Sequence, residues 1–197
     1  MVCRIQSDMF EENTYVLKNG TKIFVIDPGK GTFEKIETNN RQNLWVLLTH
    51  SHIDHIFELS HFAGANLYFN ESIDFVTNPA TNLSLYFPLK TPDIKKFNLC
   101  NIDDLPEYFE VIKTPGHTPG SVCFMYMKKY LFTGDTLFSD SIGRTDLPGG
   151  NEKKLFESLR LLKGLLMEYP EMEVFPGHGA PAKAADILMK NIYLKSL

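Results

Sequence analysis

The chain has 197 residues, of which 43% are hydrophobic and 12% aromatic, enough apolar side chain for a globular domain with a sizeable core. Twenty Lys and Arg residues stand against 24 Asp and Glu residues, and the resulting net charge of −4 argues against a nucleic-acid partner. The first residues turn polar before an apolar segment forms, and no later run approaches the roughly 18 apolar residues of a membrane helix. We therefore expect a soluble cytoplasmic protein that binds neither nucleic acid nor membrane.

Cysteine usage points to the same compartment. The three cysteines, Cys3, Cys100 and Cys123, are odd in number and widely spaced, with no CxxC pair. This pattern fits neither a disulfide framework nor a thiolate zinc site, so a reducing cytoplasm is expected. Because Cys123 lies in an alternating strand-like segment, we expect it to pack as a small apolar side chain.

The amino-terminal half predicts strands that alternate with short helices. Pro and Gly fall singly at the ends of elements, which predicts one domain over residues 1–197. A β-hairpin is expected around Asn19-Gly20, a dipeptide that tolerates the positive φ of a tight turn. The expected elements are strands at Thr14–Leu17, Lys22–Ile26 and Leu44–Leu48, with a weak helix from Thr32 to about Asn40.

The middle of the chain, from about Asn66 to Pro106, is expected to form loops, because Pro79, Pro88 and Pro92 interrupt any long element and only Leu67–Phe69 suits a strand. Beyond it, Leu155, Leu159, Leu162 and Leu166 recur at helical spacing after the N-cap candidate Asn151, which predicts a helix to about Met167. The other expected elements are strands at Glu110–Lys113, Ser121–Tyr126, Tyr130–Thr133 and Glu173–Phe175 and a helix from Ala182 to about Leu194. Mixed strands followed by alternating helices and strands predict an α+β fold in which helices cover the sheets.

Candidate ligands gather in four short blocks, each placed just past an expected strand. The blocks are Thr49–His55, which reads THSHIDH, Pro115–Gly120, Thr133–Thr136 and Pro176–Gly179. Five of the six histidines fall in three of these blocks, and the remaining block carries Asp135. Ligand sites in sheet proteins form beyond the carboxyl ends of strands, so the blocks are expected to converge there.

The block from His50 to His55 carries the strongest chemical signal. His50 and His52 point the same way only in an extended segment, where both reach one ion, while Asp54 and His55 at the start of a following helix reach a second. Imidazole and carboxylate together suit zinc or iron better than magnesium or calcium. Seven candidate ligands exceed the four of one tetrahedral zinc and predict a two-metal site: His50, His52, Asp54, His55, His117, Asp135 and His178. In this interpretation Asp135 bridges the two ions.

Simpler interpretations exist for some of these residues. Asp54 and His55 could be ordinary residues of a helix amino terminus, where the dipole favours a carboxylate. Asp27, which precedes Pro28-Gly29, is expected to be a turn residue.

At these blocks the sequence resembles the metallo-β-lactamase superfamily, whose THxHxDH, GH, GD and second GH elements all occur here in order. The resemblance implies a four-layer αββα sandwich with the metal site at the edge between the two sheets. It also implies that His50, His52 and His117 bind one metal, that Asp54, His55 and His178 bind the other, and that Asp135 lies between them.

Within the superfamily, the segments Pro115–Ser121 and Phe132–Phe138 resemble the short glyoxalase II-like (hydroxyacylglutathione hydrolase-like) enzymes. The segment Ile142–Asp146 resembles those enzymes and also the persulfide dioxygenases. Where true glyoxalase II carries a Lys and a Tyr for glutathione, this chain has Arg144 and Asp146, and the helical region that completes the thiol site is missing after His178. Arg144 and Asp146 are therefore the candidate substrate-binding residues, with a structural pair between them as the alternative.

The leading hypothesis is a binuclear hydrolase, with Zn²⁺ the expected metal, that cleaves small acyl-thioesters or related esters. Two ions about 3.5–4 Å apart can lower the pKa of a shared water to about 7, and a thiolate leaves without a strong general acid. The rival hypothesis is a mononuclear iron persulfide dioxygenase that uses His50, His117 and Asp135 as a facial triad. A metal-stabilised binding module is disfavoured, because a structural zinc needs only four ligands. A serine hydrolase is disfavoured because the sequence lacks the GxSxG motif. The expected partner is a small thioester or thiol-derived molecule; the sequence leaves the acyl group, the thiol carrier, the metal loaded and the oligomeric state open.

Overall fold

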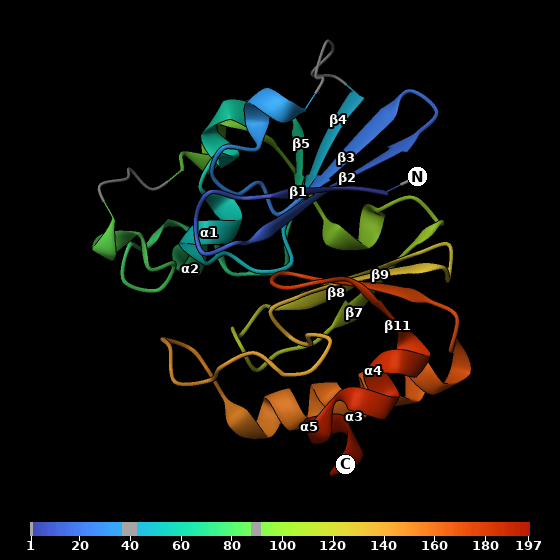
Figure 1. Cartoon of the computed structure of the whole chain (residues 1–197). Helices are drawn as coiled ribbons and strands as arrows, with labels where there is room; N and C mark the ends of the chain where they lie inside the picture. The colour runs from blue at the N-terminus through green and yellow to red at the C-terminus, as the bar shows by residue number, and fades with distance from the viewer. Residues whose placement is uncertain (1, 37–42, 88–91) are drawn as a thin grey trace. The chain divides into compact units, whose positions relative to one another are not determined.

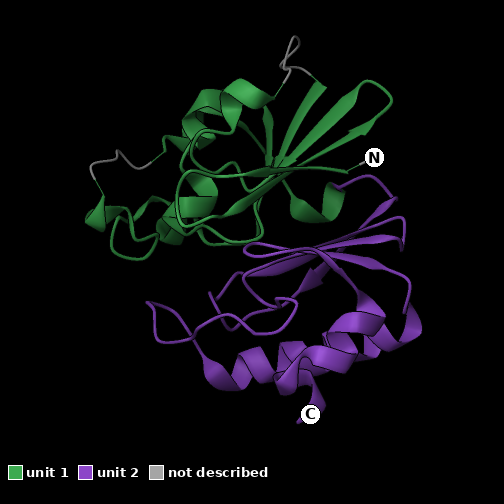
Figure 2. Ribbon diagram, in the orientation of Figure 1, with its two compact units in different colours: residues 1–104 green, residues 105–197 purple. Residues whose placement is uncertain are grey.

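The computed structural model describes residues 2–36, 43–87 and 92–197. The chain divides into two compact units, Met1–Asp104 and Leu105–Leu197 (Figure 2). Each unit holds one mixed β-sheet and its own buried apolar cluster. The expectation of one domain over residues 1–197 stays a prediction.

The first unit is built on a six-stranded sheet in the order β1-β2-β3-β4-β5-β6 (Figure 1). Strands β1 to β3 pair antiparallel, and β3 to β6 pair parallel. The carboxyl ends of β3 and β4 therefore meet at one edge of the sheet. The strands are β1 Val2–Gln6, β2 Asn13–Asn19, β3 Lys22–Ile26, β4 Leu44–Leu47, β5 Asn66–Tyr68 and β6 Asn98–Cys100.

The predicted hairpin and the buried strand are confirmed. Gly20 in the β2–β3 turn has φ of +57°, as an Asn-Gly turn requires. The weak helix expected from Thr32 is a single 3₁₀ turn, η1 (Phe33–Lys35), and residues 37–40 lie outside the described residues. After β4 come a one-turn helix, α1 (Ile53–Ile56), and a 3₁₀ turn, η3 (Leu59–Phe62).

The expectation of loops between Asn66 and Pro106 was wrong at two elements. Helix α2 (Ile73–Thr77) forms there because the Ser72 side chain accepts a hydrogen bond from the Phe75 amide. Strand β6 adds a parallel edge, but its three residues are too short to show alternation in sequence. The 3₁₀ turns in this stretch are η4 (Ser84–Tyr86), η5 (Ile94–Lys96) and η6 (Ile102–Asp104). Strand β1 was also missed, because only pairing with β2 orders it.

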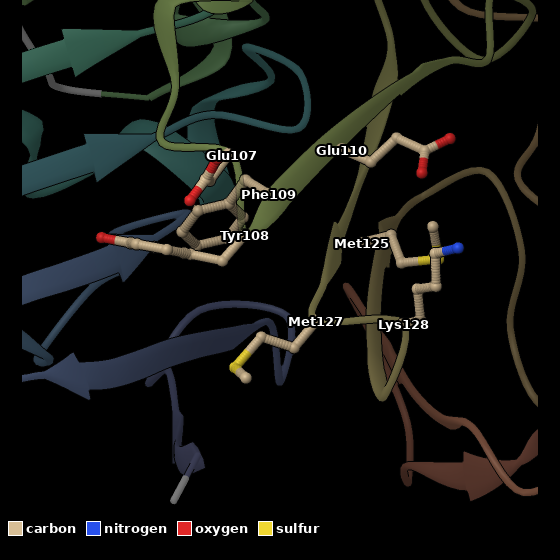
Figure 3. Close-up of a pocket in the computed structure, with 7 residues that line it drawn as sticks. All are labelled: Glu107, Tyr108, Phe109, Glu110, Met125, Met127 and Lys128. Atoms are coloured by element: carbon tan, nitrogen blue, oxygen red, sulfur yellow. The ribbon is translucent and has the colours of Figure 1, made fainter.

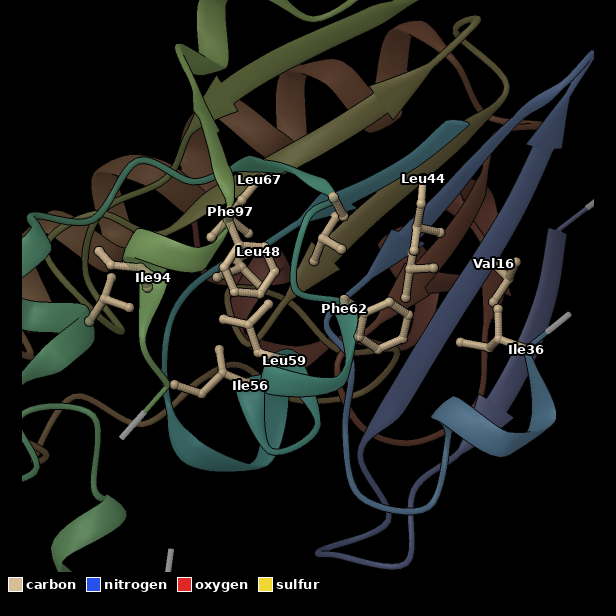
Figure 4. Packing of buried hydrophobic residues seen from close by; sticks show 14 of the residues in the cluster. Val16, Ile36, Leu44, Leu48, Ile56, Leu59, Phe62, Leu67, Ile94 and Phe97 are labelled. Carbon is tan, nitrogen blue, oxygen red and sulfur yellow. The ribbon is translucent and has the colours of Figure 1, made fainter. Parts of the chain in front are cut away.

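Apolar side chains from the strands and from the segments that follow them form the core of the first unit (Figure 4). Leu59 and Phe62 of η3 are fully buried in this cluster together with Val46 and Leu67 of the sheet. The segment that follows the THSHIDH block is thus anchored in the core, which holds the block in place.

The second unit contains a five-stranded sheet in the order β11-β10-β9-β8-β7. Strand β8 is antiparallel to β7 and β9, and β9 is parallel to β10, so β7, β9 and β10 all point the same way. Their carboxyl ends share one edge. The strands are β7 Phe109–Lys113, β8 Val122–Tyr126, β9 Tyr130–Gly134, β10 Glu173–Pro176 and β11 Ala182–Lys183.

The predicted long helix is α3 (Glu152–Glu168), and Asn151 caps it by accepting a hydrogen bond from the Lys154 amide at 3.0 Å. The four predicted leucines of α3 are buried in the core of this unit. The helix expected from Ala182 to Leu194 is instead β11 followed by α4 (Ala184–Lys190) and α5 (Ile192–Lys195). It breaks at Asn191, whose side chain accepts the amides of Tyr193 and Leu194 and so starts a new helix.

Cys123 packs in the core of the second unit, as predicted. It is fully buried, and burial raises the pKa of its thiol to about 12. The predicted α+β class is confirmed, with a mixed sheet and helices in each unit. Within the described ranges, no helix combines the length and the apolarity needed to cross a membrane.

The leucine stripe of α3 gives a test of the packing. Leu162 is fully buried, whereas its neighbour Leu161 is 53% exposed. Leu162→Ala should cost about 2–5 kcal/mol of unfolding free energy through lost burial and a cavity, and Leu161→Ala less than about 0.5 kcal/mol. Urea unfolding followed by circular dichroism measures both. Equal losses in the two variants would contradict this packing.

Candidate metal centre

The THSHIDH block lies where the sequence predicted it, directly after β4. His50 and His52 lie in extended chain, and His52 precedes the first turn of α1, which holds Asp54 and His55. All four side chains are buried. The imidazole centroids of His50 and His52 are 4.9 Å apart, and those of His50 and His55 are 4.1 Å apart. The block therefore presents a compact set of imidazoles at the carboxyl edge of the first sheet.

A buried carboxylate, Asp27, fixes two of these imidazoles. Its Oδ1 accepts the Thr49 amide at 2.8 Å, and its Oδ2 accepts the Thr49 hydroxyl at 2.6 Å. The same Oδ2 lies 3.1 Å from Nδ1 of His55. Because a carboxylate only accepts, His55 donates from Nδ1 and presents an unprotonated Nε2.

The Thr49 hydroxyl links Asp27 to His50 and so fixes the tautomer of that histidine as well. Its oxygen lies 3.1 Å from Nδ1 of His50, and its proton is already directed at Asp27. His50 must therefore donate from Nδ1 to the hydroxyl oxygen, which leaves its Nε2 unprotonated as well. An unprotonated Nε2 with a hydrogen-bonded Nδ1 is the state in which histidine binds a transition metal.

Asp27 was missed as a functional residue by the sequence analysis, which assigned it to a turn. It does lie in a turn, with φ of +53° and its carbonyl accepting the Gly29 amide. Its position was nevertheless readable, because Asp27 follows β3 and β3 is parallel to β4, the strand before the histidine block. The strand-end argument that selected the four ligand blocks selects Asp27 too.

A buried and a half-buried glutamate support this arrangement, and the sequence indicated neither. Glu12 is fully buried with Oε1 3.9 Å from Nδ1 of His55, so a second carboxylate faces that imidazole. Glu58 accepts the amides of Gly31, Thr32 and Phe33 at 2.6–2.8 Å. It thereby fixes the loop that follows Asp27.

The second unit brings together the other three candidates. His117, Asp135 and His178 follow β7, β9 and β10, whose carboxyl ends share one edge. Oδ2 of Asp135 lies 3.6 Å from Nε2 of His117 and 3.5 Å from Nε2 of His178. The Asp135 carboxylate therefore lies between the two imidazoles of this unit.

The loop after Asp135 orients His117. Nδ1 of His117 lies 2.7 Å from the carbonyl oxygen of Arg144, and since a carbonyl only accepts, the proton is on Nδ1 and Nε2 is unprotonated. Gly143 permits this close approach, because a Cβ there would lie 1.8 Å from the Asp135 carbonyl oxygen and 3.3 Å from Cγ of His117. His178 is half-buried beside the ring of Phe138.

Arg144 and Asp146, the candidate substrate-binding residues, pair with each other. Nε and Nη2 of Arg144 donate to the two carboxylate oxygens of Asp146, each at 2.6 Å. These hydrogen bonds lower the pKa of the Asp146 carboxyl to about 2. The alternative of a structural pair is thus observed, and a contact of either residue with substrate stays a prediction.

The second unit contains a cavity of about 300 Å³, whose lining residues are drawn in Figure 3. It adjoins Tyr108 and Phe109 at the amino end of β7 and Met127 and Lys128 in the β8–β9 turn, whereas His117 follows the carboxyl end of β7. A second cavity of about 300 Å³ adjoins Ser139, Asp140 and α4. Neither cavity is lined by any of the seven candidate ligands.

The donor set fits divalent transition metals. It consists of five imidazoles and two carboxylates, and the three imidazoles with assigned hydrogen bonds, His50, His55 and His117, all present Nε2. Nitrogen-rich ligands of this kind favour zinc or iron over magnesium or calcium. The structure therefore supports a divalent metal and leaves the choice between zinc and iron to experiment.

Comparison with known proteins supports the same chemistry. A family model described as the metallo-beta-lactamase superfamily matches residues 8–68 and 71–178. A probable metallo-hydrolase of Streptococcus pyogenes serotype M6, M6_Spy0554, is 35% identical over 85% of this chain and 79% of its own. The hydroxyacylglutathione hydrolase GloC of Haemophilus influenzae is 29% identical over 95% and 94% of the two chains.

A solved structure extends the likeness to the fold. TTHA1623, described in a di-iron-bound form, matches with a TM-score of 0.81 and 28% identity and covers 98% of this chain and 100% of its own. The predicted fold family is thus confirmed over nearly the whole chain.

The role of Asp27 can be tested through metal affinity. Asp27→Ala removes the acceptor that orients His55 directly and His50 through Thr49, so the affinity for Zn²⁺ should fall about 10–100-fold. Competition with a chelating dye measures the affinity, and Asp103→Ala, which removes an exposed carboxylate of the same unit, is the control. An Asp27→Ala protein that folds and binds Zn²⁺ as wild type does would refute this role.

Proposed function

Because the chain belongs to the metallo-β-lactamase superfamily, we propose that it is a metal-dependent hydrolase with a binuclear centre. The observation that carries the proposal is the set of seven ligand-type side chains, three more than a single tetrahedral ion needs. Each unit supplies part of the set, and each part is held by its own hydrogen bonds.

The family motif assigns the ligands in the proposed centre. One ion would be held by His50, His52 and His117, the other would be held by Asp54, His55 and His178, and Asp135 would lie between them. Two sets of distances inside the units agree with this division. Asp54 Oδ2 is 3.7 Å from Nε2 of His55, and Oδ2 of Asp135 is nearly equidistant from Nε2 of His117 and Nε2 of His178. The ring of His50 lies close to both His52 and His55, so the ring distances do not assign it to either ion.

The proposed chemistry divides between metal and protein. When bound, two divalent ions lower the pKa of a water to about 7 and polarise a carbonyl. Asp27 and the Arg144 carbonyl keep the protons of His55 and His117 on Nδ1, and the chain buries His50, His52 and His55. The ligand set thus stays fixed during the reaction, which lowers the cost of reorganisation.

Small acyl-thioesters are the substrates that this proposal favours. A thiolate is a good leaving group, so the site needs no strong general acid, and the hydroxyacylglutathione hydrolase GloC is among the relatives of similar length. Zn²⁺ is the proposed metal. A cytoplasmic location remains part of the proposal.

A mononuclear iron persulfide dioxygenase is the second candidate. It would use His50, His117 and Asp135, the two-histidine and one-carboxylate set that suits Fe²⁺. A protein of similar fold is described in a di-iron-bound form, which supports iron as the metal of this candidate but does not support a single ion. Metal content together with oxygen uptake separates the two candidates.

The number of metal ions tests the binuclear proposal. Purified protein reconstituted with Zn²⁺ and freed of excess metal should contain two ions per chain, because one ion cannot use seven ligands. Elemental analysis against protein concentration gives the ratio. A plateau at one ion per chain would count against the binuclear centre, and one iron with oxygen uptake on persulfides would favour the second candidate.

Asp54 separates the two candidates by mutation. In the hydrolase Asp54 binds the second ion, so Asp54→Ala should lose one ion and reduce thioester hydrolysis by orders of magnitude. In the dioxygenase Asp54 is outside the ligand set, so the single iron should remain and activity should fall only about 10–100-fold. Asp74→Ala, an exposed carboxylate on α2, is the control. Wild-type metal content and hydrolysis in Asp54→Ala would refute its assignment as a ligand.

A further inference from the structure

The segment from Gly143 to Asp146 reaches the candidate ligands of the second unit through its backbone. The carbonyl of Arg144 accepts the Nδ1 proton of His117, and the backbone of Gly143 packs against the Asp135 carbonyl. The position of this segment therefore decides how His117 is oriented. The guanidinium of Arg144 donates hydrogen bonds to Asp146, which lies only two residues further along the same segment.

The Arg144 side chain is already hydrogen-bonded to Asp146. Its Nε and Nη2 form the two-pronged edge that matches a carboxylate, and both donate to Asp146 at 2.6 Å. A substrate carboxylate would need the same edge, so it would first have to displace Asp146. The pair is exposed, with 63% and 67% of the two side chains accessible.

We propose that Arg144 and Asp146 are positioning residues for the metal centre and that their pair locks the Arg144 carbonyl in place to hold the tautomer of His117. This proposal rests on the proposed function only in taking His117 as a metal ligand. When the pair is intact, the carbonyl keeps the proton on Nδ1 and His117 presents Nε2. When it is broken, the segment gains freedom, the Nε2–H tautomer becomes populated, and that tautomer cannot bind a metal through Nε2.

In this proposal each unit fixes histidine tautomers with a hydrogen-bond acceptor, but the acceptor is a different group in each unit. In the first unit the Asp27 carboxylate fixes the tautomers of His50 and His55. In the second unit a main-chain carbonyl does this for His117, and a carbonyl cannot be removed by mutation. The Arg144–Asp146 pair, which is proposed to hold that carbonyl, can be removed by mutation.

Zn²⁺ affinity of the full chain, measured by competition with a chelating dye, tests the lock without any turnover. Arg144→Ala, Asp146→Ala and the double variant should each lose the same roughly 2- to 5-fold in affinity, because the lock can transmit no more than the coupling of an exposed pair. Arg144→Lys keeps the charge but loses the two-pronged contact, so it should also lose affinity. Lys183→Ala is the matched control, since Lys183 and Glu171 form another exposed pair of the same unit at 2.7 Å; it should bind Zn²⁺ as wild type does.

Two further readouts distinguish a lock from a substrate contact. Long-range ¹H–¹⁵N spectra of the metal-free protein, with His117 assigned by substitution, should show Nδ1–H in wild type and a mixture of tautomers in Arg144→Ala. With a thioester substrate and saturating Zn²⁺, Arg144→Ala should leave KM unchanged. A raised KM with unchanged Zn²⁺ affinity would overturn the proposal in favour of substrate binding.

The proposal would also fail if the single variants kept wild-type affinity, or if the double variant lost the product of the two single losses. A protein that hydrolyses no thioester but shows the expected Zn²⁺ pattern would refute the substrate class and leave the lock standing. Circular dichroism of each variant verifies that the fold is retained.

Discussion

The Asp27 carboxylate is the group on which the metal-binding arrangement of the first unit depends. A histidine binds a metal well only when its other nitrogen holds a proton in a fixed direction. Asp27 meets this requirement for His55 directly and for His50 through the Thr49 hydroxyl. It can do so because the parallel pairing of β3 and β4 places the end of one strand beside the end of the next. One buried acceptor thus defines the tautomers of two of the three histidines in the block.

The same requirement explains the less regular features around the ligands. Glu58 uses its carboxylate to hold the amides of the loop after Asp27, although it lies beyond α1 in sequence. Gly143 is needed where the backbone passes within contact of Asp135 and His117. Asn191 ends α4 and also donates to the carbonyls of Phe138 and Ser141 in the loop that precedes Gly143. These residues bind no metal, but they fix the chain segments that do.

The sequence predicted much of this arrangement where the signal is local. The hairpin strands, the Asn-Gly turn and the leucine stripe of α3 were confirmed, because each is decided by contacts within a few residues. The edge strands β1 and β6 were not predicted, since only pairing with a neighbour orders them. The position of each ligand block just past a strand was also confirmed. Glu12 was missed because a lone buried acid carries no periodic signal. Asp27 was missed because the Pro-Gly that follows it indicated a turn, although it also lies at the end of β3.

The central proposal, carried by the family motif, is that seven side chains bind two metal ions in one centre. Anomalous diffraction from crystals of the Zn²⁺-loaded protein, recorded on both sides of the zinc edge, tests it most directly. The account predicts two zinc peaks per chain, one in contact with Nε2 of His50, His52 and His117 and the other with Asp54, His55 and His178, with Asp135 touching both. A single peak, or peaks bound by residues of one unit alone, would contradict it.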